Sequence, residues 1–144
     1  FNNAYPQVRD EGRMRLFKSH RPDYKDGEQL RDFIYVKDAV NMTLFFLDHP
    51  DIGGIYNIGT GRTQSWNDVA AALFKAAGQP LTIEYIPMPD HLKGKYQYHT
   101  EARMTKLAAA GYDRPRTVLE DAVADYVNNH LVPGRHLGEE TAGS

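Results

Sequence analysis

Two side chains in this sequence are suited to bind a nucleotide. Arg31 directly precedes the apolar stretch "DFIYV", so it stands at the end of an expected strand that could face a cleft. A guanidinium pairs with phosphate oxygens through two parallel hydrogen bonds, which suits a diphosphate. Tyr96, in "KGKYQ", could stack on a base or bond a sugar hydroxyl, with Lys93 and Lys95 adding positive charge. The alternatives are an exposed charge at a strand end and a solvated loop.

A pair of glycines raises the question of a phosphate loop. Gly59-Thr60-Gly61 follows an expected strand and precedes an expected helix, as dinucleotide-binding loops do. Position 64 is Gln where a third glycine would stand, and no acidic residue ends a suitably placed second strand. The sequence therefore favours a tight turn between a strand and a helix over a cofactor loop.

The usual catalytic groupings are missing from the sequence. A Tyr-x-x-x-Lys pair would supply an acid/base group for hydride-transfer chemistry, because the Lys lowers the pKa of the phenol. None of the 9 tyrosines has Lys at that spacing, and the 6 histidines show no metal-type pairing on one helix face. No nucleophile-elbow sequence supports a Ser-His-Asp set. Without cysteine, thiolate chemistry and disulfides are excluded.

Composition describes one globular domain and argues against several classes of partner. The chain has 144 residues, of which 41% are hydrophobic and 25% charged, with a net charge of −2. No basic stripe suggests nucleic acid, and no apolar run reaches the ~18 residues of a membrane span. The first ten residues, "FNNAYPQVRD", lack the apolar core of a signal peptide. We expect a cytoplasmic protein.

The first half of the chain predicts a strand, a helix and a second strand. Residues 31–36, "RDFIYV", are rich enough in β-branched and aromatic side chains for a strand. Asp38 is expected to cap the next helix, because its carboxylate can accept bonds from first-turn N–H groups. Apolar residues continue at helical spacing to Leu47, so this helix is expected to be largely buried. Residues 54–59, "GIYNIG", predict a short buried strand.

Capping motifs mark the next helix and strand. Ser65 and Asp68 form the pattern of a capping box in front of "WNDVAAALFKAAG". Gly78 and Pro80 end that helix in the order that helix ends favour. Residues 81–88, "LTIEYIPM", alternate as a strand does, and a polar loop follows them.

Two more helices are expected near the end. Thr100 is expected to cap a helix through Ala109, and Thr117 with Glu120 forms another capping pattern. One face of the last helix is apolar; its members are Val118, Leu119, Ala122, Val123, Tyr126, Val127 and Leu131. The order strand–helix–strand–helix–strand and then two helices predicts an α/β or α+β fold, a few strands packed with about four helices.

Several stretches of the chain resemble one enzyme family. They are "RDFIYVKDAV", "GIYNIGTGR", "IEYIPMPDHLKGKYQYHTEA", "LAAAGYDRP" and "LEDAVADYV". Together they resemble the ADP-L-glycero-D-manno-heptose 6-epimerases, which are extended short-chain dehydrogenases/reductases. In that family a Rossmann domain holds NADP and a Tyr-x-x-x-Lys pair, and a smaller C-terminal domain holds the nucleotide sugar. The chain resembles the second domain, so we expect the Rossmann domain to be absent from it.

The resemblance implies a division of the chain and a set of ligand contacts. Residues 1–15 would be a remnant of the segment that leads from the Rossmann domain, 16–132 the nucleotide-sugar-binding domain and 133–144 a disordered tail. The positions that match the family's contacts to its ADP-sugar are Asn2, Phe17, Lys18, Ser19, His20, Arg31 and Tyr96. The family's second catalytic base, a Lys, falls on Glu11, and a helix between "GRM" and "LFK" is missing. No catalytic residue is therefore expected here.

Two functions remain open from the sequence. The first is the ADP-heptose-binding part of an epimerase, not catalytic alone and without a cofactor of its own, although the intact family uses NADP. The second is a non-enzymatic module that binds or self-assembles through the apolar face that a missing Rossmann half would expose. Expected partners are a weakly held nucleotide sugar and either a second copy or a Rossmann half, with no nucleic acid and no membrane.

Overall fold

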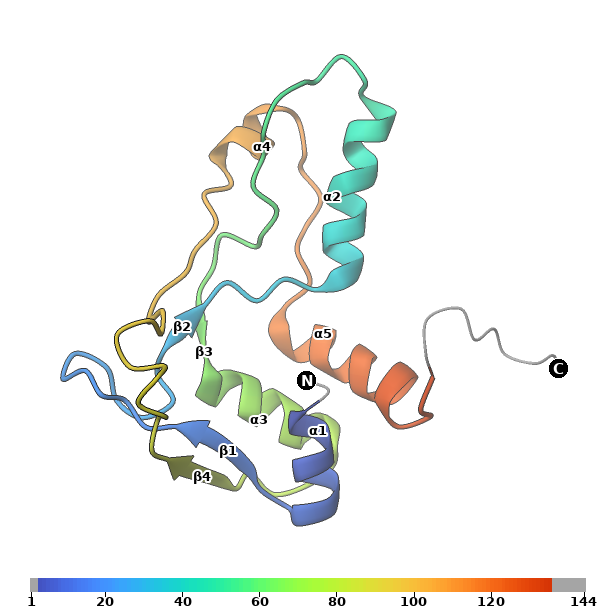
Figure 1. Cartoon of the computed structure of the whole chain (residues 1–144). Coiled ribbons are helices and arrows are strands. Elements are labelled where there is room, and N and C mark those ends of the chain that lie inside the picture. Colours follow the sequence, from blue (N-terminus) through green and yellow to red (C-terminus); the bar gives the residue numbers. More distant parts are fainter. Residues whose placement is uncertain (1–2, 136–144) are drawn as a thin grey trace, which may run out of the picture.

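A computed structural model describes residues 3–135 and divides them between two lobes (Figure 1). The lower lobe holds two parallel strands, β1 (Met14–Phe17) and β4 (Ile83–Ile86), with Met14 opposite Ile83 and Phe17 opposite Ile86. The upper lobe holds α2 (Val36–Asp48) and α4 (Thr105–Ala109). A short antiparallel pair, β2 (Leu30–Arg31) with β3 (Gln64–Ser65), lies where the lobes meet.

Helices cover the strands of the lower lobe. They are α1 (Ala4–Pro6) with its π-helical continuation η1 (Gln7–Glu11), α3 (Trp66–Ala76), and α5 (Leu119–Tyr126) with the π-helical η2 (Val127–Leu131). Val8, Leu73, Phe74 and Val127 are almost fully buried in the core between them. This mixed arrangement of helices and small sheets confirms the predicted fold class.

The capping box at the start of α3 is confirmed. The Ser65 hydroxyl accepts a bond from the Asp68 N–H at 3.0 Å, and the Asp68 carboxylate accepts one from the Ser65 N–H at 2.8 Å. Gly78 follows the helix at φ 66°, a left-handed conformation that glycine adopts without strain. Local sequence alone determines both ends of this helix.

Two other predicted caps are wrong, because the side chains bond each other. α2 begins at Val36 and α5 at Leu119, and neither has a side-chain cap. Asp38 is buried and accepts two bonds from Thr117, from the N–H at 2.7 Å and from the hydroxyl at 2.9 Å. These bonds fasten the first turn of α2 to the chain that enters α5.

The boundaries of the remaining elements also differ from prediction. The strand expected at 31–36 is limited to Leu30–Arg31, since the next residue, Asp32, turns its carboxylate to neighbouring loops. Residues 54–59 form no strand, and Ile55 is 88% exposed. α4 begins at Thr105 instead of following Thr100.

The helix α2 is less buried than its sequence predicts. Its inner face packs Met42, Phe45 and Phe46 into a second core with Leu107 and Tyr112. Its outer face is exposed, because nothing in residues 3–135 covers it; the exposed members are Val36, Val40, Leu44 and Leu47.

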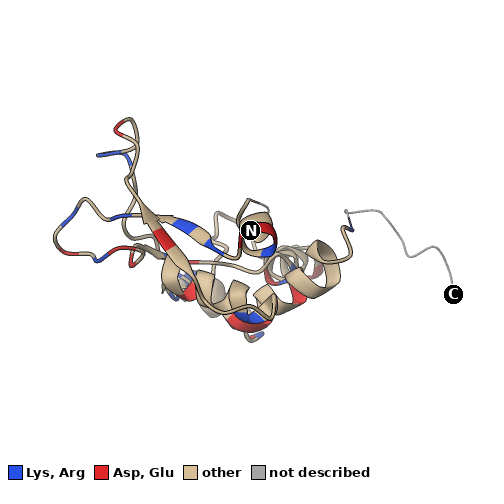
Figure 2. Cartoon of the chain, turned by 90° about the horizontal axis from the view of Figure 1, so that it is seen from below, with Lys and Arg blue, Asp and Glu red and all other residues tan. Residues whose placement is uncertain are grey.

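Charges are mixed over the lower lobe, where acidic and basic positions lie among one another (Figure 2). The ion pairs Arg13–Glu11 and Arg15–Glu11 are examples. No helix within residues 3–135 has the length and apolar character needed to cross a membrane.

Candidate functional site

Three separate segments bring the predicted ligand contacts together. Phe17 ends β1 and leads into residues 18–20, Arg31 ends β2, and Tyr96 lies in the loop after β4. The Leu30 N–H donates to the Tyr98 carbonyl at 2.8 Å, which fastens this loop beside β2. Residues far apart in sequence thus share one surface at the ends of two strands.

The Arg31 guanidinium is held in place by backbone and by an aromatic ring. It donates to the carbonyls of Leu30, at 2.8 Å, and Gln97. Its central carbon lies 5.2 Å from the centroid of the Tyr96 ring, which in turn meets Phe17 edge to face at 6.2 Å. Its remaining N–H groups make no hydrogen bond within the described residues, so they are available to an anion.

The Tyr98 hydroxyl anchors the 19–20 loop. The ring is buried, and its hydroxyl accepts a bond from the His20 N–H at 3.0 Å and lies 2.7 Å from His20 Nδ1. The Ser19 hydroxyl is 3.4 Å away from the same oxygen. Sequence reasoning missed Tyr98, although its spacing of two from Tyr96 is the signal for rings on the same side of an extended segment.

Arg21 adds a second cation beside the aromatic cluster, and it too was missed. Its guanidinium carbon lies 5.0 Å from the centroid of Tyr98 and 5.4 Å from that of Tyr24. Asp23 fixes it through a bond from Nε at 3.0 Å. The site therefore has an aromatic floor with positive charge at two points of its edge.

Two of the predicted contacts are not part of this cluster. Lys18 is exposed and contributes its backbone N–H to the Ile86 carbonyl at 2.8 Å, which extends the β1–β4 ladder. Asn2 lies outside the described residues.

Glu11 is ion-paired at the other end of β1 from Phe17. Its carboxylate accepts bonds from Arg15, at 2.5 Å and 3.2 Å, and from Arg13 at 3.1 Å. The bond from Arg15 and then that from Arg13 lower the Glu11 pKa. An ionised carboxylate that is paired in this way has no proton to donate near neutral pH.

The glycine turn at 59–61 does not fit a dinucleotide phosphate. Asp32 accepts bonds from the N–H groups of Thr60 at 2.8 Å, Gly61 at 2.9 Å and Ala102 at 3.0 Å. Burial opposes ionisation of this carboxylate, but the bonds from Thr60, Ala102 and Gly61 outweigh it and the pKa is lowered. The turn's N–H groups thus already face a negative charge, which would repel a phosphate.

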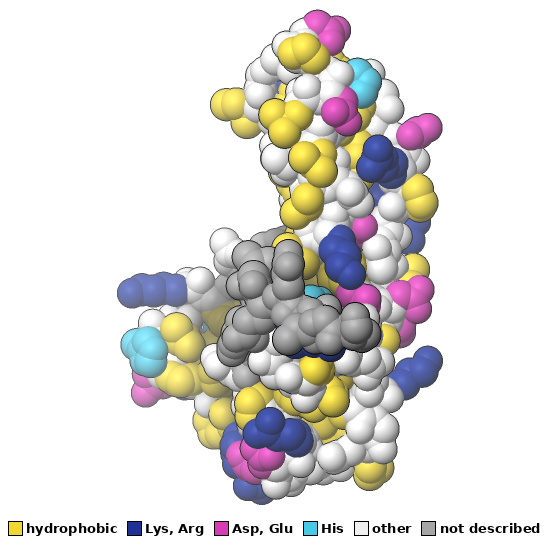
Figure 3. Space-filling model, turned by 90° about the vertical axis from the view of Figure 1, so that its right-hand side faces the viewer, with side chains coloured by type: hydrophobic (Ala, Val, Ile, Leu, Met, Phe, Trp, Pro, Cys, Tyr) yellow, Lys and Arg dark blue, Asp and Glu magenta, His cyan; other side chains and the backbone are white. Residues whose placement is uncertain are grey.

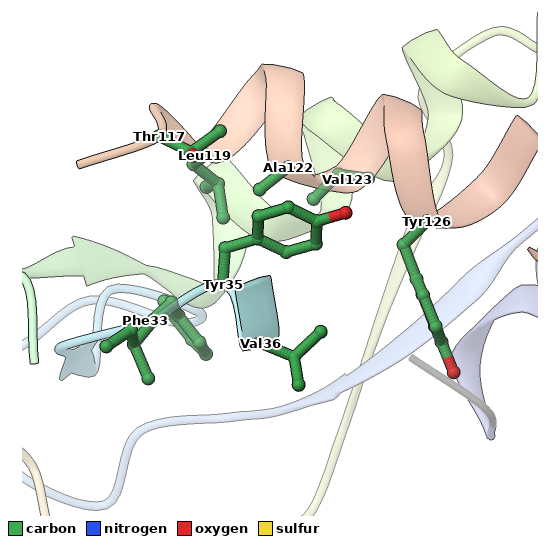
Figure 4. A pocket seen from close by; sticks show the side chains of 9 residues that line it. Phe33, Tyr35, Val36, Thr117, Leu119, Ala122, Val123 and Tyr126 are labelled. Carbon is green, nitrogen blue, oxygen red and sulfur yellow. The ribbon is translucent and has the colours of Figure 1, made fainter. Parts of the chain in front are cut away.

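An apolar cavity of about 320 Å³ lies between the start of α2 and α5 (Figure 4). The Tyr35 ring points toward Leu119, Ala122 and Val123 of α5. Its hydroxyl donates to Asp125, which also accepts a bond from Lys37 at 2.9 Å. Burial and then this carboxylate raise the Tyr35 pKa, the opposite of what a catalytic phenolate base needs. The cluster ties α2 to α5.

Comparison with known proteins identifies the family. A family model described as "NAD dependent epimerase/dehydratase family" matches residues 11–59. Over 128 residues the chain is 51% identical to an ADP-L-glycero-D-manno-heptose-6-epimerase of Nitratidesulfovibrio vulgaris strain DP4. Residues 11–59 are therefore similar to the NAD-dependent epimerase/dehydratase family, and most of the chain is similar to part of a heptose epimerase. A second heptose epimerase of this family, from Fusobacterium nucleatum, is 44% identical over 135 residues.

The chain matches only part of each family member. The alignment with the N. vulgaris relative covers 89% of this chain but only 40% of the relative's length. A solved heptose epimerase of Helicobacter pylori superposes with a TM-score of 0.70 at 24% identity, covering 88% of this chain and 36% of the other. UDP-glucose 4-epimerase of Bifidobacterium longum, solved with NAD+ and UDP, superposes with a TM-score of 0.67 at 26% identity. The superposition covers 84% of this chain and 35% of the other. The resemblance to part of a heptose epimerase is thereby confirmed.

Proposed function

We propose that this chain is the nucleotide-sugar-binding part of a heptose epimerase, with an ADP-sugar as its ligand. The observation that carries the proposal is the convergence of Phe17, His20, Arg31 and Tyr96 on one surface from three segments of the chain. Heptose epimerases are its relatives at 44% and 51% identity, which supports ADP-heptose in particular.

The chemistry of the surface suits the two ends of such a ligand. The unbonded N–H groups of Arg31 can meet a diphosphate, and a guanidinium does so bidentately. The rings of Phe17 and Tyr96 offer apolar and π surface to a base or a sugar. Glu11 and the Asp32-filled glycine turn provide neither a base nor a cofactor cradle, so we infer binding without turnover by this chain alone.

A titration with ADP followed by NMR chemical shifts tests the proposal. On the proposal that this chain forms one wall of the site, we expect a Kd of about 1 mM, near 4 kcal/mol, with shifts centred on Arg31 and Tyr96. Removing a charge-assisted phosphate contact costs about 1.5–3 kcal/mol, so Arg31→Ala should abolish detectable binding.

The matched control is Arg114→Ala, which removes an exposed guanidinium from the 112–118 connection. It should leave the ADP shifts unchanged. Wild-type shifts that miss Arg31 and Tyr96, or an Arg31→Ala titration equal to wild type, would contradict the proposal. The self-assembling module would then be the better account of the chain.

A further inference from the structure

The loop between β1 and β2 is fastened at two places. We call residues 18–29 the ligand loop, because Ser19 and His20 of the candidate surface belong to it. Tyr98 anchors the end that faces the candidate ligand. The opposite corner, at residues 26–27, lies against the first turn of α3. Residues 18–29 contain neither helix nor strand, so these anchors determine which shape the loop keeps.

Asn67, the second residue of α3, makes the anchor at residues 26–27. Its backbone N–H donates to the Gly27 carbonyl at 3.1 Å, and its side-chain Nδ2 donates to the Asp26 carbonyl, also at 3.1 Å. Its Oδ1 accepts a bond from the Tyr85 hydroxyl of β4 at 2.9 Å. Because a carbonyl only accepts, the Asp26 carbonyl requires the NH2 end of the amide, and Tyr85 takes the oxygen end. The amide thus has one orientation, in which it joins the loop to a helix and a strand.

Gly27 allows the loop to lie this close to the helix. Its φ is 74°, a left-handed conformation that glycine adopts without strain. A Cβ at this buried position would lie 2.0 Å from Asn67 Oδ1 and 2.6 Å from Asn67 Cγ. Any larger residue would therefore displace the Asn67 amide from the place where it bonds the loop.

The Asp26 carboxylate connects this anchor to the ligand-facing end. Its Oδ1 accepts a bond from the Ser19 N–H at 2.7 Å. The Ser19 hydroxyl lies 3.4 Å from the Tyr98 hydroxyl, to which the His20 N–H donates at 3.0 Å. Asn67 holds the carbonyl of the same residue whose carboxylate holds Ser19. Movement of the corner would therefore pull the carboxylate away from Ser19.

We propose that Asn67 is a positioning residue for the candidate ligand surface. It holds residues 26–27 on α3, and through the Asp26 carboxylate it fixes Ser19 and His20 in the places where a nucleotide sugar meets them. The side chain acts through the loop and touches no ligand itself. The inference rests on the proposed function for the ligand, whereas the order of the loop is measured without one.

Amide exchange in the ligand-free chain tests the inference first. Asn67→Asp keeps the shape of the side chain and its acceptor for Tyr85, but sets an oxygen against the Asp26 carbonyl. The new carboxylate lies in the first turn of α3, where negative charge favours the helix, so α3 should stay intact. We expect the Ser19 and His20 amides to exchange at least ~10-fold faster than in wild type, while the amides within α3 keep their rates. Wild-type exchange at both residues overturns the proposal.

Tyr85→Phe is a second variant, and it adds no charge. It removes the hydroxyl that orients the Asn67 amide and leaves the ring in place. We expect Ser19 and His20 to exchange roughly 3-fold faster, because the anchor loses one hydrogen bond and keeps the others. Wild-type rates in this variant overturn the proposal, whatever Asn67→Asp shows.

The ADP titration separates positioning from stability. A residue that serves stability alone would lower the unfolding midpoint and leave the Kd of the folded chain unchanged. For Asn67→Asp we expect a Kd about 5-fold higher than that of wild type, which corresponds to the loss of roughly one hydrogen bond. A Kd equal to that of wild type overturns the positioning role.

Asn57→Asp is the matched control. The Asn57 side chain also donates to a backbone carbonyl, that of Arg103 at 3.2 Å, but Arg103 leads into α4 of the upper lobe. Figure 3 shows this lobe rising above the lower lobe, with hydrophobic side chains spread over its surface. The variant should keep wild-type exchange at Ser19 and His20. An acceleration equal to that of Asn67→Asp overturns the proposal, since any lost amide bond would then act alike.

The two proposals fail in different measurements. Faster loop exchange in Asn67→Asp together with no ADP shifts in the wild-type chain contradicts only the ligand. ADP shifts in the wild-type chain together with an unchanged Kd in Asn67→Asp contradict only the positioning role.

Discussion

At the scale of single residues, one buried hydroxyl holds the 19–20 loop of the candidate site. Tyr98 is buried, and its oxygen lies within hydrogen-bonding distance of both the His20 N–H and Nδ1. Its ring also supports Arg21 and touches Tyr96. Tyr98 therefore helps to position His20, Arg21 and Tyr96 of the candidate site.

Replacing Tyr98 by Phe keeps the ring and removes the hydroxyl. We expect a loss of about 1 kcal/mol in the free energy of unfolding and weaker ADP shifts at His20, because the loop loses its anchor. Tyr112→Phe is the control: that ring is equally buried in the second core, and no hydrogen bond of its hydroxyl is found within residues 3–135. Equal ADP titrations for Tyr98→Phe and wild type would show that the hydroxyl does not position the loop.

The Asp125 carboxylate makes the free energy of unfolding depend on pH in the acid range. The bond from Tyr35, then that from Lys37, lowers the Asp125 pKa to about 2. Its folded pKa lies below its unfolded value near ~3.9, so this contribution is complete above ~pH 4 and is lost as the pH falls toward ~2. Solvent screens the pair, so we expect about 1 kcal/mol. Urea denaturation of Asp125→Asn should lack this part of the acid loss; an identical pH profile for both proteins would refute the assignment.

At the scale of elements, local sequence patterns predicted the helix ends whose contacts lie close together in the sequence. Ser65 and Asp68 cap their own helix, so their pattern was sufficient. Asp38 and Thr117 could cap helices in the same way, but they bond each other across the fold instead. Their positions in the sequence, 79 residues apart, do not predict this contact. The predicted strand at 54–59 failed for a related reason: its pattern is that of a strand, but it pairs with no other strand within residues 3–135.

The candidate site was predicted in part. Arg31 and Tyr96 were singled out by their own chemistry, Phe17, Ser19 and His20 only by the family resemblance, and the fold brings the five together. Tyr98 and Arg21 were not predicted, because their roles arise from contacts between loops.

A glycine of the turn at 59–61 has a packing role. A Cβ on Gly59 would lie 2.3 Å from the Ala102 Cβ and 2.9 Å from an Asp32 oxygen. Gly59→Ala should therefore cost about 1–3 kcal/mol through overpacking, as measured by thermal unfolding. Gly53→Ala provides the comparison, since nothing lies within 4 Å of a Cβ there. If both variants unfold at the wild-type temperature, the close approach at Gly59 has no energetic role.

At the scale of the whole molecule, the two lobes have separate cores and a narrow junction. The junction includes the β2–β3 pair, the bonds between Asp38 and Thr117, and the bonds from Tyr35 and Lys37 to Asp125. The lower lobe and its neighbouring loops carry the candidate ligand surface, whereas the upper lobe carries the uncovered apolar face.

The isolated chain should bind no NADP. Its glycine turn is filled by the Asp32 carboxylate, and the first turn of α3 is occupied by its own capping box. Titration calorimetry with NADP should give no saturable heat. A micromolar Kd for the isolated chain would contradict this expectation.

The bond between Tyr98 and His20 joins residues 78 positions apart in the sequence. During synthesis at about 5–20 residues per second, the 19–20 loop leaves the ribosome roughly 4–16 s before the tyrosine that orders it. For that interval the loop and the Phe17 ring are exposed without their partners. The candidate site can therefore assemble only after Tyr98 has emerged, and a ribosome stalled before β4 would present β1 without its partner strand and the loop without its anchor.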